Sequence, residues 1–301
     1  MSDHDRARLW AAAFGPDPGE HPLRVGPGWE RSWLAAVTLG GRGRYAAAAT
    51  LLWPVITGTD PTGAALAAVT LAAHRRQLGG HAIARDLDAL GLRRLAEAAA
   101  TTGERSPATG GQDRRWGGAD AAAARSDALL GLAADAIGLG ELHEARTLLG
   151  IESASTDGGW RAEIKRGWVA AEVELAAGRP EAALPPARAA AAAATRSPSR
   201  RLVAKSNLVL GATLAAAGDR PGALLAINDC LRDAITHGLV PLRWPCRIVL
   251  ADLEPERADE HRREAATALD CVLRHADPAG RAAAAASPWV PTSGFDLGPN
   301  R

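Results

Sequence analysis

The sequence predicts an all-α protein, a right-handed α-solenoid of about six antiparallel helix pairs. Its 301 residues are rich in alanine, including an unbroken run over 189–194, and only 4% are aromatic. Such a composition favours helices over sheets. Glycines that follow helical patterns recur 36, 61, 38 and 40 residues apart, at Gly43, Gly79, Gly140, Gly178 and Gly218. A period of this length with turn glycines indicates a repeat array.

The longest interval, 61 residues, contains an obvious insertion over residues 101–118. This stretch is rich in Gly, Thr, Ser and Arg and lacks helical periodicity. Without its 18 residues the interval becomes 43, close to the others. We therefore expect an inserted loop at 101–118 between two helix pairs.

The repeat pattern is clearest around Gly218. A small residue, Gly211, lies seven positions before it and Leu214 four positions before it, while Ala223 and Ile227 follow it. Small residues let two helices cross closely, and large apolar residues fill the remaining gaps. The copies around Gly140 and Gly43 fit the same frame.

This spacing resembles that of the tetratricopeptide-repeat superfamily over roughly residues 29–275, although its signature aromatics are mostly missing and the period exceeds the usual 34. The resemblance implies helical hairpins, and it is greatest to the long-helix repeats of large bacterial regulators. Around Gly178, we expect Pro185 and Pro186 to disturb the second helix of the pair.

The elements follow from this frame. The expected helix pairs are 29–39 with 44–57, 62–78 with 81–100, 119–138 with 141–150, 159–177 with 180–195, 199–217 with 220–237, and 241–253 with 257–275. Four prolines in the segment before residue 28 predict an extended N-terminal arm over 1–28. The Ala, Pro, Gly and Ser content of residues 276–301 predicts a disordered tail.

Charge and cysteine content narrow the class of protein. The net charge of +1 gives no sign of the excess positive charge that is typical of nucleic-acid-binding proteins. The polar N-terminus lacks the apolar core of a signal peptide. Three cysteines without a C-x-x-C motif favour a reducing, cytoplasmic setting. Residues 45–73 carry one formal charge, yet prolines and glycines divide them into pieces too short for a membrane span.

Enzymatic chemistry finds little support. No catalytic serine motif occurs, and Cys271 with His275 supplies only two of the four ligands that zinc needs. We predict no metal, no cofactor and no enzymatic activity. The alternative is a nucleotide-binding enzyme that uses Gly41–Ala46, since this loop matches G-x-G-x-x-A and residues 34–39 could form the preceding strand.

The two lysines of the chain point to a binding groove. Among 35 Lys and Arg residues only two are lysine, they lie 40 positions apart, and they fall at the same place in successive repeats. Arginine is so abundant that it carries little weight by itself. Aligning the repeats on their turn glycines predicts five residues on the inner, concave faces of the first helices: Trp33, Lys165, Trp168, Glu172 and Lys205.

We therefore predict an interaction scaffold or adaptor that binds a peptide or protein partner in a concave groove. The lysines could pair with a carboxylate or phosphate of the partner, and Trp168 could anchor it. The alternative is that both lysines are solvated and that Trp33 and Trp168 pack between neighbouring hairpins. Self-association through the ends of the solenoid is a further expectation, because open solenoids need caps.

Overall fold

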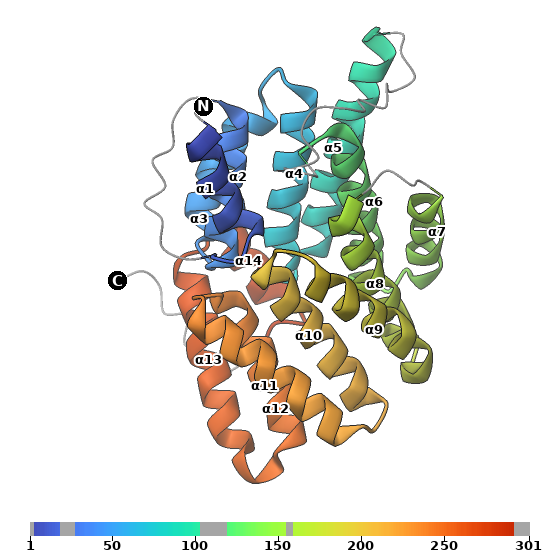
Figure 1. Cartoon of the computed structure of the whole chain (residues 1–301), viewed down its shortest axis with the longest axis vertical. Helices are drawn as coiled ribbons and strands as arrows, with labels where there is room; N and C mark the ends of the chain where they lie inside the picture. The colour runs from blue at the N-terminus through green and yellow to red at the C-terminus, as the bar shows by residue number, and fades with distance from the viewer. Residues whose placement is uncertain (1–2, 19–27, 103–118, 155–158, 292–301) are drawn as a thin grey trace.

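The computed structural model describes residues 3–18, 28–102, 119–154 and 159–291, and these form helices without any strand. Figure 1 shows the helices stacked as antiparallel pairs along the chain. The prediction of an all-α solenoid with six helix pairs is thereby confirmed. The pairs are α2 (Trp29–Gly41) with α3 (Tyr45–Ile56), α4 (Pro61–Arg76) with α5 (His81–Thr102), α6 (Ala121–Gly138) with α7 (Leu142–Ser153), α8 (Gly159–Ala176) with α9 (Pro180–Arg196), α10 (Arg200–Ala216) with α11 (Arg220–Thr236), and α12 (Val240–Leu253) with α13 (Ala258–Arg274).

The five predicted turn glycines follow the first helix in each of the first five pairs; the sixth pair, α12 with α13, has none. All five have positive φ, between 69° and 82°, which L side chains rarely adopt. At Gly211 the requirement for glycine is steric, because a Cβ atom there would lie 2.6 Å from the side chain of Ile227. The absence of a side chain lets α10 and α11 cross closely, as the repeat spacing predicts.

Both flanking predictions need correction where the structure describes them. Within the expected extended arm, residues Asp3–Phe14 form α1, and within the expected disordered tail, Pro278–Ala286 form α14. In α1, Ala13 and Phe14 follow Trp10 by about one turn, so the three side chains share one face of the helix. All three are buried against the first helix pair. Burial of this apolar face stabilises the helix. The prolines that follow it in the sequence favour an extended segment, which is why the sequence alone predicts no helix here. Most of the predicted 101–118 loop lies outside the described residues.

The prediction that Pro185 and Pro186 disturb their helix is wrong, because α9 runs unbroken through both. Each proline removes one backbone hydrogen bond, to the carbonyl groups of Glu181 and Ala182. These two residues are exposed, so solvent can hydrate the carbonyl oxygens that the prolines leave unpaired.

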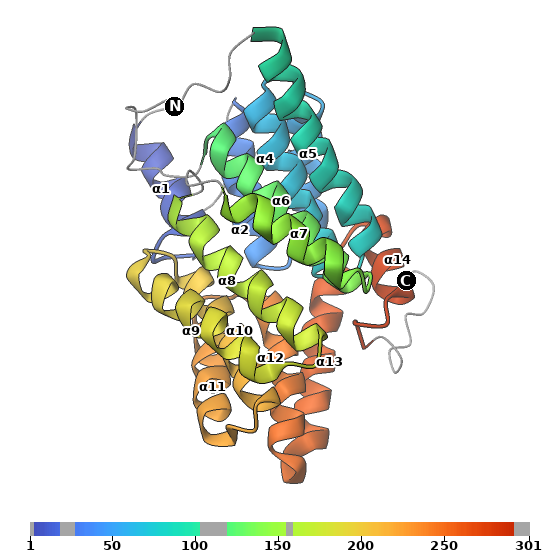
Figure 2. The same ribbon diagram turned by 90° about the vertical axis from the view of Figure 1, so that its right-hand side faces the viewer.

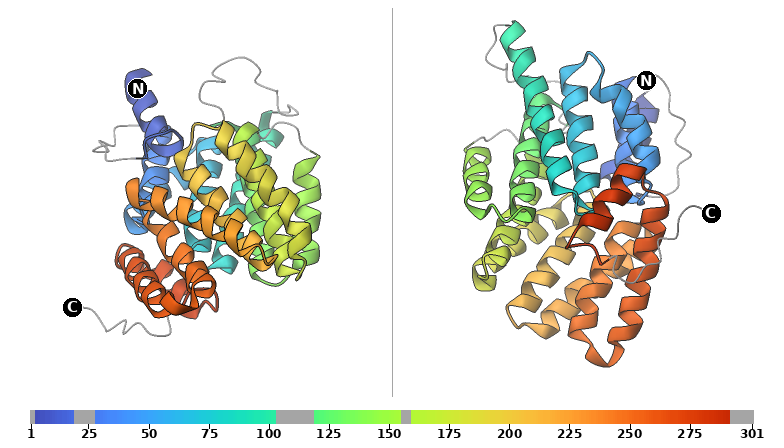
Figure 3. Two further views of the ribbon diagram at one scale, coloured as in Figure 1. Left: turned by 60° about the horizontal axis from the view of Figure 1, so that its bottom comes forward. Right: turned by 180° about the vertical axis from the view of Figure 1, so that it is seen from behind.

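The solenoid closes on itself. The backbone N–H of Ala46, in the first pair, donates to the carbonyl of His275 at the end of the last pair, over 2.8 Å. Tyr45 is buried in one apolar cluster with Leu269, Val272 and Leu273 of α13. Figures 2 and 3 show the last helices, in red, returning beside the blue and teal helices of the first pairs.

An ion pair joins the end of the chain to its second repeat. Arg75 of α4 donates from both Nη atoms to the carboxylate of Asp277, over 2.7 and 2.6 Å. Asp277 also caps α14 by accepting from the N–H of Gly280. Trp289 extends this contact, since its indole N–H donates to the carbonyl of Gly138 in α6.

Among the described helices, none is long and apolar enough to cross a membrane.

Replacing Asp277 with Asn tests whether this ion pair holds the closure. Asn can still cap α14, but it leaves the buried charge of Arg75 without a partner, so we expect a loss of about 3 kcal/mol in unfolding free energy.

The ion pair also makes stability depend on pH. Burial opposes ionisation of the Asp277 carboxyl group, yet Arg75 and the Gly280 N–H lower the pKa of Asp277. Its contribution is therefore present above about pH 4 and lost as the pH falls through the folded-state pKa.

Urea unfolding at pH 7 and at decreasing pH measures both effects. The control is Asp259→Asn, because the Asp259 side chain is 94% exposed and pairs only across the helix surface. Equal stability of Asp277→Asn and the control at pH 7 would contradict a closing role for the ion pair.

Candidate ligand-binding channel

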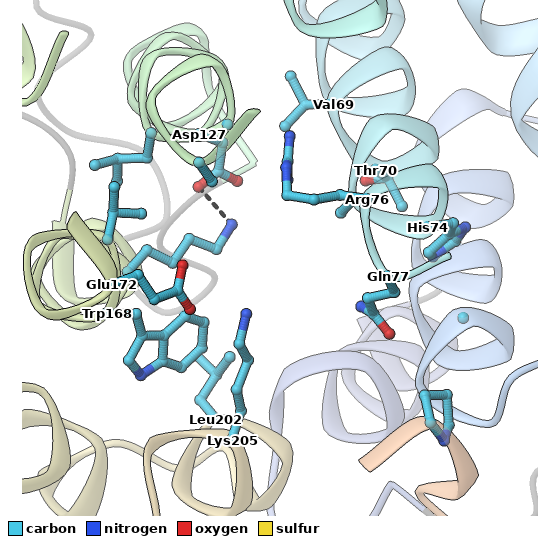
Figure 4. A pocket seen from close by; sticks show the side chains of 18 of the residues that line it. Val69, Thr70, His74, Arg76, Gln77, Asp127, Trp168, Glu172, Leu202 and Lys205 are labelled. Atoms are coloured by element: carbon cyan, nitrogen blue, oxygen red, sulfur yellow. Dashed lines mark hydrogen bonds and ion pairs between the residues drawn. The ribbon is translucent and has the colours of Figure 1, made fainter. Parts of the chain in front are cut away.

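The closed solenoid surrounds a cavity of about 590 Å³. Its walls come mainly from the first helices of the pairs, α2, α4, α6, α8, α10 and α12. Phe14 of α1, Gln77, His81 at the start of α5, and Trp289 complete them. In Figure 4, Val69, Thr70, His74 and Arg76 of α4, with Gln77 directly after this helix, lie across the cavity from side chains of α6, α8 and α10. We call this cavity the channel.

All five residues that the repeat frame places on the inner face line this one channel: Trp33, Lys165, Trp168, Glu172 and Lys205. They come from α2, α8 and α10. The common register of the first helices brings them together, since residues at one repeat position face the same axis.

The two tryptophans are wall elements. Trp33 is 1% exposed and its indole N–H donates to Thr70 Oγ1 over 2.9 Å; Trp168 is 5% exposed and donates to Ser206 Oγ over 2.8 Å. Each indole thus ties its helix to that of a neighbouring repeat, as the packing alternative expects. Each also contributes apolar surface to the channel.

Lys165 is paired within the channel. Its Nζ donates to Asp127 Oδ1 over 2.7 Å, and Arg161 Nη2 donates to Asp127 Oδ2 over 2.9 Å. Burial would raise the pKa of Asp127, but these two cations outweigh it and lower that pKa. Burial lowers the pKa of Lys165 to about 8, even though Asp127 opposes the shift.

Lys205 has a different environment. Its Nζ lies 4.4 Å from the ring centroid of Trp168, a cation–π contact, and it forms no ion pair with the described residues. Burial lowers the pKa of Lys205, and the nearby carboxylate of Glu172 partly offsets that shift. In Figure 4, Lys205 and Glu172 point into the same part of the channel.

Arg161 and Arg201 also line the channel, although the repeat frame alone does not single them out. Each precedes a channel lysine by four residues, so R-x-x-x-K occurs in two successive repeats. This repeated spacing is a usable signal, but the abundance of arginine concealed it. Burial and the neighbouring Arg161 lower the pKa of Arg201 to about 10, so it stays charged at neutral pH.

The opposite wall holds a neutralised charge network. Arg76 of α4 donates to Asp88 and to Asp135, both fully buried. Burial raises the pKa of Asp88 well above its ordinary value, despite the attraction of Arg76. Burial, with Arg201 and Arg75 nearby, lowers the pKa of His74 to about 3, so this imidazole is neutral.

The nucleotide-binding alternative is not supported by the geometry of Gly41–Ala46. Residues 34–39, the strand that such a site requires, belong to helix α2, so that expectation is wrong. Gly43 lies in the turn between α2 and α3. It packs against α13 so closely that a Cβ atom at this position would lie 3.1 Å from Cγ2 of Val272. The loop is thus part of the ring closure.

The cysteines do not gather with other ligands. Cys230 and Cys246 are buried with their sulfurs 3.2 Å apart, and Nδ1 of His275 bonds the carbonyl of Cys271. Within the described ranges, no group of three or more His, Cys, Asp or Glu side chains is placed to hold a metal ion.

Comparisons with known proteins define the class of fold. No protein-family profile matches the chain, and no curated protein matches it. Among solved structures it is similar to a Rap protein complexed with competence and sporulation factor, with a TM-score of 0.53 and 11% identity, covering 84% of this chain and 77% of that chain. At this identity the likeness shows the fold: this chain has a TPR-like helical repeat fold.

The pKa of Lys165 leads to a prediction about stability. An unfolded lysine has a pKa near 10.4, so between about pH 8 and pH 10 the unfolded chain holds a proton that folded Lys165 has lost. The unfolding free energy therefore rises with pH in this window. In Lys165→Met this contribution to the rise is absent, because methionine does not titrate.

Urea unfolding of both proteins from pH 7 to pH 10 checks this. We expect the stability of the wild type to increase relative to that of Lys165→Met as the pH rises. Parallel curves over the whole range would show that Lys165 titrates as an exposed lysine.

Proposed function

We propose that this protein is an interaction scaffold that binds a peptide or protein partner through a short peptide segment held in the channel. The channel residues Trp33, Lys165, Trp168, Glu172 and Lys205 contact the segment. The observation that carries the proposal is a cavity that the first helices of all six repeats line together.

The size of the channel supports a short segment. A volume of about 590 Å³ falls within the range of small-ligand sites. The walls combine apolar and aromatic surface with a few charged groups, the usual composition of a site that orients a ligand. A long folded partner could enter only by one chain segment, because the repeats surround the cavity.

The chemistry of the walls also supports a peptide. Trp168 offers apolar surface beside the ammonium group of Lys205, and Glu172 supplies an acceptor nearby. Apolar side chains, carbonyl oxygens and N–H groups of a peptide would all find complementary partners there.

The likeness to the Rap protein adds support of a different kind. That protein has a comparable helical-repeat fold and was solved in complex with competence and sporulation factor. By this analogy we propose that the present chain works in a bacterial regulatory assembly, as a binding protein without catalytic activity of its own. Self-association remains a separate prediction, which the mass measured by light scattering checks.

Peptide display against the purified chain tests the proposal. We expect enrichment of short peptides, and we expect Lys205→Met to weaken the best of them about tenfold or more, because a buried ammonium contact is lost. Lys205 forms no ion pair with the described residues, so the variant should fold normally. Fluorescence anisotropy with the selected peptide gives the affinities.

The matched control is Arg232→Met, on the outer helix α11. The Arg232 side chain is 67% exposed and lies away from the channel, so its loss should leave the affinity unchanged. The proposal fails if no peptide is enriched, or if the enriched peptides bind the wild type, Lys205→Met and the control equally.

A further inference from the structure

We propose that the channel binds its peptide in one orientation, with a carboxylate of the peptide between Arg161 and Arg201 and its apolar residues toward the opposite end. This inference rests on the proposed function and specifies the ligand. It also assigns a role to two arginines that the repeat frame alone does not single out.

The four cations form a regular array. Arg161 and Lys165 lie on α8, Arg201 and Lys205 on α10, and both pairs have the i, i+4 spacing that places side chains on one helix face. All four line the channel. The arginines stand in the first turn of each helix, so they mark one end of the channel.

The array holds more positive charge than its surroundings neutralise. Asp127 is shared by Arg161 and Lys165. In the part of the chain that the structure describes, Arg201 forms no ion pair, and Lys205 has only the more distant carboxylate of Glu172. Two carboxylates thus face four cations, which leaves this end of the channel positive.

Donors at this end lack acceptors. Arg161 is 2% exposed, yet its Nε and Nη1 have no hydrogen-bond partner among the described residues, and the same holds for Nε of Arg201. Buried donors without acceptors are costly, and native structures rarely keep them. A ligand oxygen that accepts from both guanidinium groups would remove this cost.

An aromatic ring holds the two arginines together. Phe14 of α1 lies 4.5 Å from the guanidinium carbon of Arg161 and 5.8 Å from that of Arg201. An aromatic ring attracts these cations without using the N–H donors that lack partners, so Nε and Nη1 of Arg161 and Nε of Arg201 stay available to a planar acceptor. A carboxylate has the matching planar, two-oxygen geometry.

The opposite end of the channel is different. Ile137 and the last turn of α8, with Leu175 and Ala176, line it, and Trp289 lies there against Gly138. Its one arginine, Arg76, is already paired with Asp88 and Asp135. The polar side chains of Gln77 and His81 line this end beside the apolar ones. The channel therefore offers a cationic end that binds an anion and a second end that is largely apolar, which fixes the direction of an amphipathic ligand.

The test uses short N-acetylated peptide pools in three arms. The first arm has a free C-terminal carboxylate and no acidic side chain. The second has an amidated C-terminus with one Asp or Glu, and the third is amidated without acidic residues. Each pool is incubated with the wild type, Arg201→Gln and the control Arg232→Gln, and bound peptides are quantified by mass spectrometry.

We expect binding in the first or second arm, which identifies the source of the carboxylate, and none in the third. Arg201→Gln should weaken it about tenfold or more, Arg201→Lys should restore part of the loss, and the control should behave as the wild type. Circular dichroism confirms folding, which the loss of an unpaired cation should not impair.

Two outcomes separate this inference from the proposed function. If neutral peptides bind as well as acidic ones and Arg201→Gln binds them equally, the orientation inference fails and peptide binding stands. If no arm binds, peptide binding fails, and tricarballylate at constant ionic strength then probes the anion site alone. Thermal stabilisation of the wild type but not of Arg201→Gln would support the anion site, whereas none in either would overturn it.

Discussion

The contact between the first and the last repeat is the constraint on which the channel depends. An open solenoid of this length would present a groove with both ends in solvent. Here Tyr45 is buried against α13, and the backbone of Ala46 bonds that of His275. Because these contacts join residues more than 220 positions apart, they fix the curvature of every repeat between them.

Closure in turn determines the environment of the charges. Surface arginines and lysines contribute little and are screened by solvent. On the inside of a closed ring the same side chains are desolvated, which explains the lowered pKa values of Lys165, Lys205 and Arg201. Desolvated cations bind an anion more strongly than exposed ones do. The ring closure thus makes these lysine and arginine side chains a candidate site for binding an anion.

Much of the fold could be predicted because it depends on local rules. A glycine at positive φ follows the first helix in five of the six pairs, and Gly211 permits a close helix crossing, so both features can be recognised in the sequence. The five inner-face residues follow from the same register. Lys165 and Lys205 were conspicuous only because lysine is so rare in this chain.

What the sequence could not supply depends on contacts between distant segments. Helix α1 is stable because Phe14 and Trp10 pack on the first repeat, and α14 because Asp277 meets Arg75. Neither contact has a local pattern. Arg161 and Arg201 are informative only once Phe14 and the channel wall surround them. Pro185 and Pro186 lie in a helix in which Glu181 and Ala182, one turn earlier, are exposed, and the sequence alone does not show this exposure.

A crystal structure of the chain with the best displayed peptide tests the central claim most directly, that the closed repeats hold a ligand inside the channel. We expect peptide density between α4, α8 and α10, with a carboxylate within hydrogen-bonding distance of Arg161 and Arg201. Peptide bound on the outer face, over the second helices of the pairs, would contradict it.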